Sequence, residues 1–159
     1  MRARRILGID PGTGILGFGI IDLDSKGGVG LVDAGVIRTP VKQADSERLL
    51  TIYDELSLLV RELKPDTMSV EKLFFSQNVT TAMSVSQARG IVLLIGKQHK
   101  LELFEYTPQQ IKQALTGYGK ADKKQIQEMV KVVLKLREVP KPDDAADALA
   151  AAICHSMNL

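Results

Sequence analysis

The first forty residues contain three apolar segments, each of strand length and each ended by turn-forming residues. Arg4–Asp10 stops at Pro11-Gly12, and Ile15–Leu23 is separated from Val29–Arg38 by Asp24-Ser25-Lys26-Gly27-Gly28. Short apolar runs bounded by glycine and proline are typical of buried strands. Because too little chain lies between them for a helix, we expect an antiparallel meander of three strands.

The spacing of apolar residues then changes to a helical period. Apolar residues recur at this spacing from Leu49 to Leu63, and Pro65 ends the pattern. A strand is predicted over residues 66–72, a second helix over residues 77–99, and a short strand over Glu102–Tyr106. Strands that each follow a helix are expected to lie parallel to the first strand.

Three more helices are predicted in the last third of the chain. Thr107-Pro108 caps and opens the first, and Gly117-Tyr118-Gly119 breaks it. Helix resumes near Asp122 and stops before Pro140, and a last helix follows Pro142. The order β-β-β-α-β-α-β-α-α-α predicts an α/β fold, with a five-stranded mixed sheet and helices packed on it, in one domain over residues 1–159.

Composition narrows the class of protein. Of the 159 residues, 45% are hydrophobic and 25% are charged, which is typical of a globular protein and excludes a disordered or fibrous one. No uninterrupted apolar run is long enough to span a bilayer, and the basic start is not a signal peptide. The single cysteine, Cys154, excludes an intramolecular disulfide and a cysteine-built zinc site. We therefore expect a cytoplasmic protein with no membrane partner.

Charge is unevenly distributed along the chain. Residues 97–141 carry ten basic and five acidic side chains, whereas the last 18 residues carry three acids and no lysine or arginine. A basic segment beside an acidic cluster suits a protein that holds a polyanion while coordinating cations. A solvated helix face is the alternative interpretation of the same counts.

One glycine motif matches a dinucleotide-binding fingerprint but lacks the structural context that the fingerprint requires. The segment 12–17 matches G-x-G-x-x-G after a strand, but that fingerprint requires a helix to begin at the glycines. Here Ile15–Leu23 continues as a strand, so the match is rejected. The glycines are expected to allow a tight turn approached closely by other backbone or a ligand.

Four carboxylates are candidates for a metal site. Asp10 closes the first strand and Glu71 closes the fourth, and the carboxyl ends of parallel neighbours meet at the edge where α/β sheets bind ligands. Asp144 and Asp147 lie three residues apart on the last helix and therefore share one face. Turn formation at Asp10 and helix capping at Asp144 are alternative interpretations, but neither explains Asp147 on an otherwise apolar helix. Oxygen-only ligands favour Mg²⁺ or Mn²⁺ and phosphate chemistry.

Basic and aromatic residues complete the candidate site. Lysines surround the helix break at residues 117–119, where they are placed to meet phosphates; they are Lys112, Lys120, Lys123 and Lys124. Phe74-Phe75 follows Glu71 closely, and a phenylalanine there could stack on an unpaired base or belong to the core.

These residues together make the chain similar to the RuvC family of Holliday junction resolvases, in the ribonuclease H-like superfamily. The resemblance extends from Gly8-Ile9-Asp10-Pro11-Gly12 through Ser86-Gln87-Ala88-Arg89-Gly90 to the segment 144–150. It implies a ribonuclease H-like fold with helices on both faces of the sheet. It also implies that the family's functional lysines fall on Lys112 and Lys123, with Lys124 as the alternative to Lys123.

The resemblance further implies roles and partners. The catalytic acids would be the four named above, holding two Mg²⁺ per subunit with Mn²⁺ as a substitute, and Phe74 would stack on DNA. Lys123 would stabilise charge on the phosphate. A homodimer, joined through the helix at residues 77–99, would make paired symmetric nicks in a four-way DNA junction. These would leave 5′-phosphate and 3′-hydroxyl ends, in recombination and repair alongside a RuvA–RuvB complex.

Three other functions fit part of the sequence. The turn at residues 10–14 is also typical of actin-like ATPases and sugar kinases, which need two domains to clasp a nucleotide. A ribonuclease acting on RNA or an RNA–DNA hybrid would use the same acids. A junction-binding scaffold without catalysis would have no need of Asp147.

Overall fold

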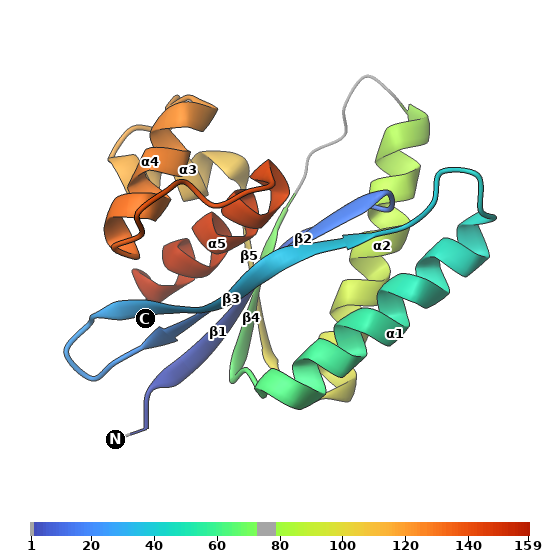
Figure 1. Ribbon diagram of the computed structural model, residues 1–159, viewed down its shortest axis with the longest axis horizontal. Helices are drawn as coiled ribbons and strands as arrows, with labels where there is room; N and C mark the ends of the chain where they lie inside the picture. Colours follow the sequence, from blue (N-terminus) through green and yellow to red (C-terminus); the bar gives the residue numbers. More distant parts are fainter. Residues whose placement is uncertain (1, 73–78) are drawn as a thin grey trace.

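The computed structural model describes residues 2–72 and 79–159, in which five strands form one mixed sheet (Figure 1). The spatial order is β3-β2-β1-β4-β5. The first three strands form the expected antiparallel meander, and β4 and β5 run parallel to β1. The strand bounds are β1 (Arg4–Asp10), β2 (Ile15–Leu23), β3 (Val29–Arg38), β4 (Thr67–Glu71) and β5 (Glu102–Tyr106).

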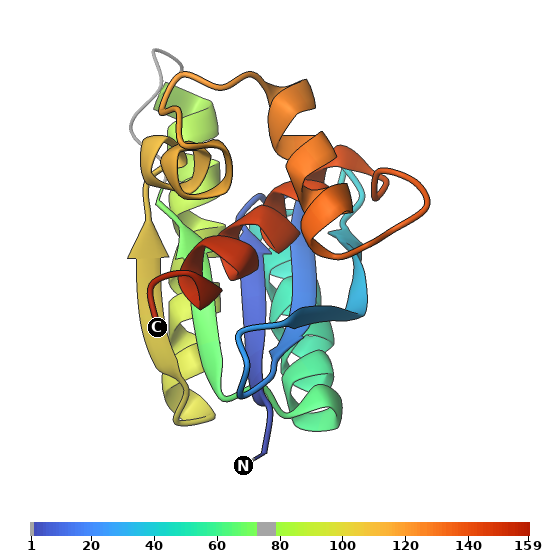
Figure 2. The same cartoon turned by 90° about the vertical axis from the view of Figure 1, so that its left-hand side faces the viewer.

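Helices cover both faces of this sheet, as predicted (Figures 1 and 2). One face is covered by α1 (Asp45–Leu63) and α2 (Val79–Gln98), and the other by α3 (Pro108–Thr116), α4 (Lys123–Val133) and α5 (Asp143–Ser156). Each helical layer shares its own aliphatic core with the sheet. The order of elements along the chain is the one that the apolar periodicity predicted.

Capping explains where two of the helices begin. The hydroxyl of Thr107 accepts a bond from the backbone N–H of Gln110, whose side chain bonds back to residue 107. Asp122 and Gln125 form the same reciprocal arrangement at the start of α4. Such capping boxes satisfy N–H groups that have no partner inside a helix. They define where the two helices that carry the candidate lysines begin.

The end of α4 lies earlier than Pro140, at Val133. Lys135 adopts a left-handed conformation with φ 54°, and the N–H of Leu136 donates to the carbonyl of Lys131 at 2.9 Å. This turn places Leu134, only 6% exposed, in the core. The left-handed turn at Lys135 therefore ends the helix before Pro140 is reached.

Glycines on the sheet allow α5 to lie directly on β1 and β2. A Cβ atom at Gly17 would lie 2.0 Å from the carbonyl oxygen of Asp144, and one at Gly8 would lie 2.0 Å from that of Ala148. Contacts this short are closer than any side chain tolerates, so both positions require glycine. The segment after Gly12 is strand β2, which confirms that no dinucleotide-binding helix begins there.

Among the described helices, α2 is long and apolar enough to cross a membrane by length and composition alone. Its sheet-facing side is buried at Ala88, Val92, Ile95 and Gly96. A single helix that packs on a sheet in this way is weak evidence for a membrane span. We therefore keep the expectation that the protein has no membrane partner.

Candidate active site

The structure brings the four predicted acids together at one edge of the sheet. Asp10 and Glu71 end the parallel neighbours β1 and β4, and the charge of Glu71 acts directly on the carboxyl of Asp10. Asp144 and Asp147 reach the same place from the first turns of α5. Carboxylate oxygens of Asp10, Asp144 and Asp147 all lie within 4.8 Å of one another. The convergence expected from strand ends and helical spacing is therefore present.

Burial and mutual repulsion make this cluster hold a proton. Burial, followed by the negative charges of the other three acids, raises the pKa of Asp10 to about 9. Burial also raises the pKa of Glu71 and the pKa of Asp147. With a pKa of about 9, Asp10 keeps its proton at neutral pH.

The donor set fits a divalent cation. It consists of carboxylate oxygens alone, which are the ligands of hard cations such as Mg²⁺, Mn²⁺ and Ca²⁺. A dication would replace the proton on Asp10 and relieve the repulsion that raises the pKa of that carboxyl.

We expect Asp10→Asn to stabilise the cation-free protein at neutral and alkaline pH. Because the pKa of Asp10 rises from 3.8 to about 9 on folding, the folded state keeps a proton that the unfolded state releases. This contribution lowers stability as pH rises through that interval. In EDTA, the free energy of unfolding of the variant should exceed that of the wild type. This difference should grow by about 1–3 kcal/mol from about pH 5.5 to about pH 8.5.

Denaturant unfolding of both proteins at the two pH values measures this effect. As a control, Mg²⁺ should stabilise the wild type more than the variant, because a cation that binds only the folded state adds to its stability. Identical pH dependences for the two proteins would contradict the assignment of the proton to Asp10.

Two lysines face the acids across a hollow of about 270 Å³. Lys112 on α3 and Lys123 at the start of α4 line it together with Glu71 and Asp147. The Nζ atom of Lys123 lies 3.7 Å from Oδ2 of Asp147. Burial acts to lower the pKa of Lys123, but the nearby carboxylates together raise it, so the ammonium stays protonated. Both lysines act to lower the pKa of Glu71.

The remaining predicted residues lie elsewhere. Lys124 lines a different hollow with Met129 and Glu128, so the helix directs Lys123 and not its neighbour toward the acids. Lys120 is exposed on the loop between α3 and α4. Phe74 and Phe75 lie outside the described residues.

Sequence reasoning missed one acid beside the site. Asp143 is not among the residues singled out above, yet its Oδ2 lies 3.3 Å from Nζ of Lys123 and its Oδ1 accepts a 3.1 Å bond from the side chain of Gln127. Those partners come from α4, so no spacing in the sequence could have indicated the contact.

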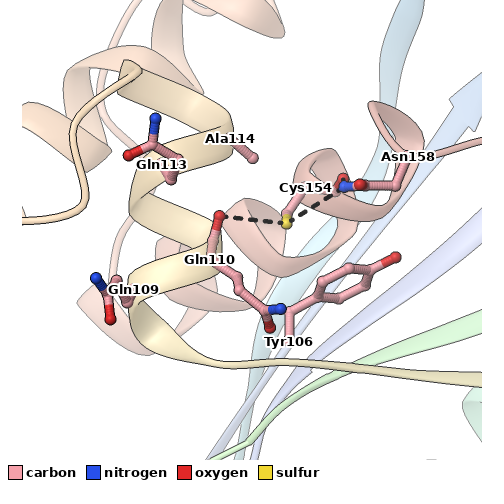
Figure 3. Close-up of a pocket in the computed structure, with 7 residues that line it drawn as sticks. All are labelled: Tyr106, Gln109, Gln110, Gln113, Ala114, Cys154 and Asn158. Carbon is pink, nitrogen blue, oxygen red and sulfur yellow. Dashed lines mark hydrogen bonds between the residues drawn. The ribbon is translucent and has the colours of Figure 1, made fainter.

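A larger hollow, of about 430 Å³, lies on another side of α3 (Figure 3). Its described lining is uncharged and consists of Tyr106, Gln109, Gln110, Gln113, Ala114, Cys154 and Asn158. Burial raises the pKa of the Cys154 thiol to about 11, so this thiol is neutral and unreactive at physiological pH. This hollow therefore offers no charged side chain among its described lining residues.

Comparison with known sequences identifies a family. The profile of a family described as crossover junction endodeoxyribonuclease RuvC matches residues 6–155. A protein of that description from Alkaliphilus oremlandii (strain OhILAs) is 55% identical over 151 residues, which cover 95% of this chain and 92% of the relative. Another, from Desulfitobacterium hafniense (strain Y51), is 55% identical over 158 residues, covering 97% and 94% of the two chains.

Comparison with solved structures points the same way. The chain is similar to Thermus thermophilus RuvC, with a TM-score of 0.89 and 34% identity over 96% of this chain and 93% of that one. It is also similar to T. thermophilus RuvC in complex with a Holliday junction substrate, with a TM-score of 0.88, 30% identity and the same coverage. With its sequence, its fold and its acidic edge in agreement, this chain belongs to the RuvC family of crossover junction endodeoxyribonucleases.

Proposed function

We propose that this chain cuts four-way (Holliday) DNA junctions during homologous recombination and DNA repair, as a divalent-cation-dependent endonuclease. The observation that carries the proposal is the meeting of four carboxyls from β1, β4 and α5 beside a hollow with two lysines. Family membership supports the junction as substrate, because T. thermophilus RuvC binds one in a structure that is similar over 96% of this chain.

The cation site is proposed to hold two Mg²⁺ per subunit, with Mn²⁺ as a substitute. The proposed ligands are Asp10, Glu71, Asp144 and Asp147. When bound, such cations make a water molecule more acidic and neutralise charge that develops on the scissile phosphate. The chain itself contributes rigid placement: two acids are fixed by strand ends and two by a helix seated directly on the sheet. Asp10 must release its proton before the site is fully charged.

Lys123 is the proposed catalytic lysine. Its charge is retained because Asp147 and Asp143 favour the ammonium form. From the hollow it can donate to phosphate oxygens, and fixed donors of this kind are effective where negative charge develops. Lys112 shares the hollow and is the second proposed phosphate contact.

Three further residues are proposed to contact DNA. Lys120 and Lys124 are exposed within the basic segment at residues 97–141, which suits contact with phosphates away from the cut. Stacking of Phe74 on an unpaired base rests on the family resemblance alone.

A homodimer through α2 is proposed from the exposed side of that helix. Val79, Met83 and Leu94 are 67%, 61% and 48% exposed, and they share one helical face with Gly90, whose Cβ position meets open space. This exposed apolar face suits contact with a second copy of the chain. Two copies would supply the two active sites that paired symmetric nicks require.

Met83→Glu is expected to weaken the dimer at least about tenfold, because a buried, unpaired carboxylate in an apolar interface is costly. Val132→Glu is the matched control, since Val132 is 63% exposed on α4, across the sheet from α2. Light scattering over a concentration series measures the association. A Met83→Glu protein that dimerises like the control would count against α2 as the interface.

The finer parts of the proposal follow from family membership. The products would carry 5′-phosphate and 3′-hydroxyl ends, a RuvA–RuvB complex would supply the junction, and the protein would act in the cytoplasm. Residues 1–159 are proposed to form one nuclease domain.

Removal of the cation separates this proposal from a junction-binding scaffold. In EDTA, the chain should bind a labelled junction without cutting it, and addition of Mg²⁺ should start cleavage. Binding that is never followed by a nick, with Mg²⁺ or Mn²⁺ present, would favour the scaffold.

A further inference from the structure

The turn that follows Asp10 is anchored by a buried threonine. Thr13 is only 4% exposed, and its hydroxyl donates to the carbonyl oxygen of Ser84 on α2 at 2.7 Å. The hydroxyl of Ser84 donates back to Oγ1 of Thr13 at 2.6 Å. Two short bonds therefore join the turn at residues 11–14 to a helix about seventy positions away in the sequence.

The backbone of the same turn is held from the opposite side. The hydroxyl of Thr39, which directly follows β3, donates to the carbonyl of Thr13 at 2.6 Å, and its N–H donates to the carbonyl of Gly14 at 3.0 Å. Nε of Arg48 on α1 donates to Oγ1 of Thr39 at 2.9 Å. Three elements outside the turn thus fix it through one connected hydrogen-bond network.

This network holds the turn that directly follows Asp10 in the chain. Asp10 is the last residue of β1, and the turn that begins at Pro11 determines where that strand ends. The turn residues Pro11-Gly12-Thr13-Gly14 include no large side chain, so Thr13 supplies the side-chain attachment of the turn. A buried hydroxyl with good partners strongly favours one arrangement, because the alternatives leave polar groups unpaired.

We propose that Thr13 is a positioning residue for Asp10. By tying the turn to α2, it keeps the Asp10 carboxylate at the distance from Asp144 and Asp147 at which the three can share a cation. The inference rests on the proposed function, since it assigns to this cluster the cation that cleavage requires. It does not assign any contact with DNA or cation to Thr13 itself.

The test compares three variants in cation titrations. Thr13→Val removes the hydroxyl at nearly constant volume, Thr13→Ser restores it, and Ser84→Ala removes the partner. Thr67→Val is the matched control: Thr67 is 1% exposed, its hydroxyl has no partner among the described residues, and it lies at the start of β4, away from Glu71. The readouts are calorimetric binding of Mn²⁺ without DNA, single-turnover junction cleavage against Mg²⁺, and junction affinity in EDTA.

For Thr13→Val we expect Mn²⁺ affinity to fall about tenfold and the cleavage rate at saturating Mg²⁺ to fall about 10- to 100-fold, since misplacement by about 1 Å has effects of this size. Junction affinity in EDTA should stay within about twofold of wild type. Thr13→Ser should recover most of the loss, Ser84→Ala should shift both quantities in the same direction, and Thr67→Val should behave as wild type.

Two results would overturn the inference. One is a folded Thr13→Val or Ser84→Ala protein with the wild-type Mn²⁺ affinity, which would leave the network a purely structural role. The other is an equal loss in Thr67→Val, which would make the effect a general one of removing buried hydroxyls. Failure of the proposed function looks different: the wild type would then bind Mn²⁺ without cutting the junction, and the calorimetric comparison would still decide the role of Thr13.

Discussion

Asp147→Asn is expected to lower the rate of junction cleavage by about 10³-fold or more while junction binding changes by less than about threefold. Asp147 is one of three acids whose oxygens lie within 4.8 Å of one another, so its loss removes a proposed cation ligand from the centre of the cluster. Electrostatic stabilisation by a bound cation is worth several kcal/mol, and about 4 kcal/mol corresponds to a thousandfold in rate. Binding is spared because the proposed phosphate contacts are made by lysines, all of which the variant keeps.

The matched control is Asp143→Asn, which removes the same charge from the same helix. Asp143 contacts Lys123 and Gln127 but is not part of the acid cluster. Its side chain is 59% exposed, and exposed ion pairs contribute at most about 1 kcal/mol, so cleavage should fall by no more than about fivefold. Single-turnover cleavage and gel-shift binding of both variants measure the contrast. Comparable losses in the two would contradict the assignment of Asp147 as a ligand.

Gly17→Ala is expected to impair cation binding and cleavage although Gly17 has no side chain that could bind a cation. Gly17 pairs with Asp10 across β1 and β2, and an added Cβ would lie 2.0 Å from the carbonyl oxygen of Asp144 and 3.1 Å from its Cβ. Because the nearest atom is backbone, α5 must move away and take Asp144 with it. We expect cleavage to fall about 10²-fold and stability by about 1–3 kcal/mol.

Gly30→Ala is the control, since Gly30 also lies in a strand but its Cβ position meets nothing within 4 Å. That variant should cleave as wild type. Thermal unfolding shows whether Gly17→Ala is folded at the assay temperature, and Mn²⁺ calorimetry shows whether its site is displaced. A folded Gly17→Ala protein with wild-type cation affinity would contradict the requirement for close packing of α5.

The element order, the strand directions and the meeting of the acids could be predicted from the sequence because they follow from simple patterns. Turn residues separate the three opening strands, and parallel strands place Asp10 and Glu71 at one edge. Helical spacing then places Asp144 and Asp147 on one face of α5. Beyond these local patterns, the meeting of the acids needs only the pairing of β1 with β4 and the packing of α5 on the sheet.

The supporting residues could not be predicted, because their roles come from contacts between distant segments. From the sequence alone, Gly17 is a strand residue and Thr13 is a turn residue. Their roles come from the packing of α5 over Gly17 and from the hydrogen bonds between Thr13 and Ser84. The choice between Lys123 and Lys124 depends on the rotation of α4 about its axis, which is set by the packing of Ile126 and Val130 in the core.

Cleavage of a mobile four-way junction, with each of the four strands labelled in turn, tests the central claim most directly. Linear duplex and an RNA–DNA hybrid serve as parallel substrates, each with Mg²⁺ and with EDTA. The account predicts paired, symmetric nicks on the junction alone, dependent on Mg²⁺, with ends that a ligase can seal. Cleavage of the hybrid with the junction left intact would contradict it, since the acidic site would then serve a different substrate.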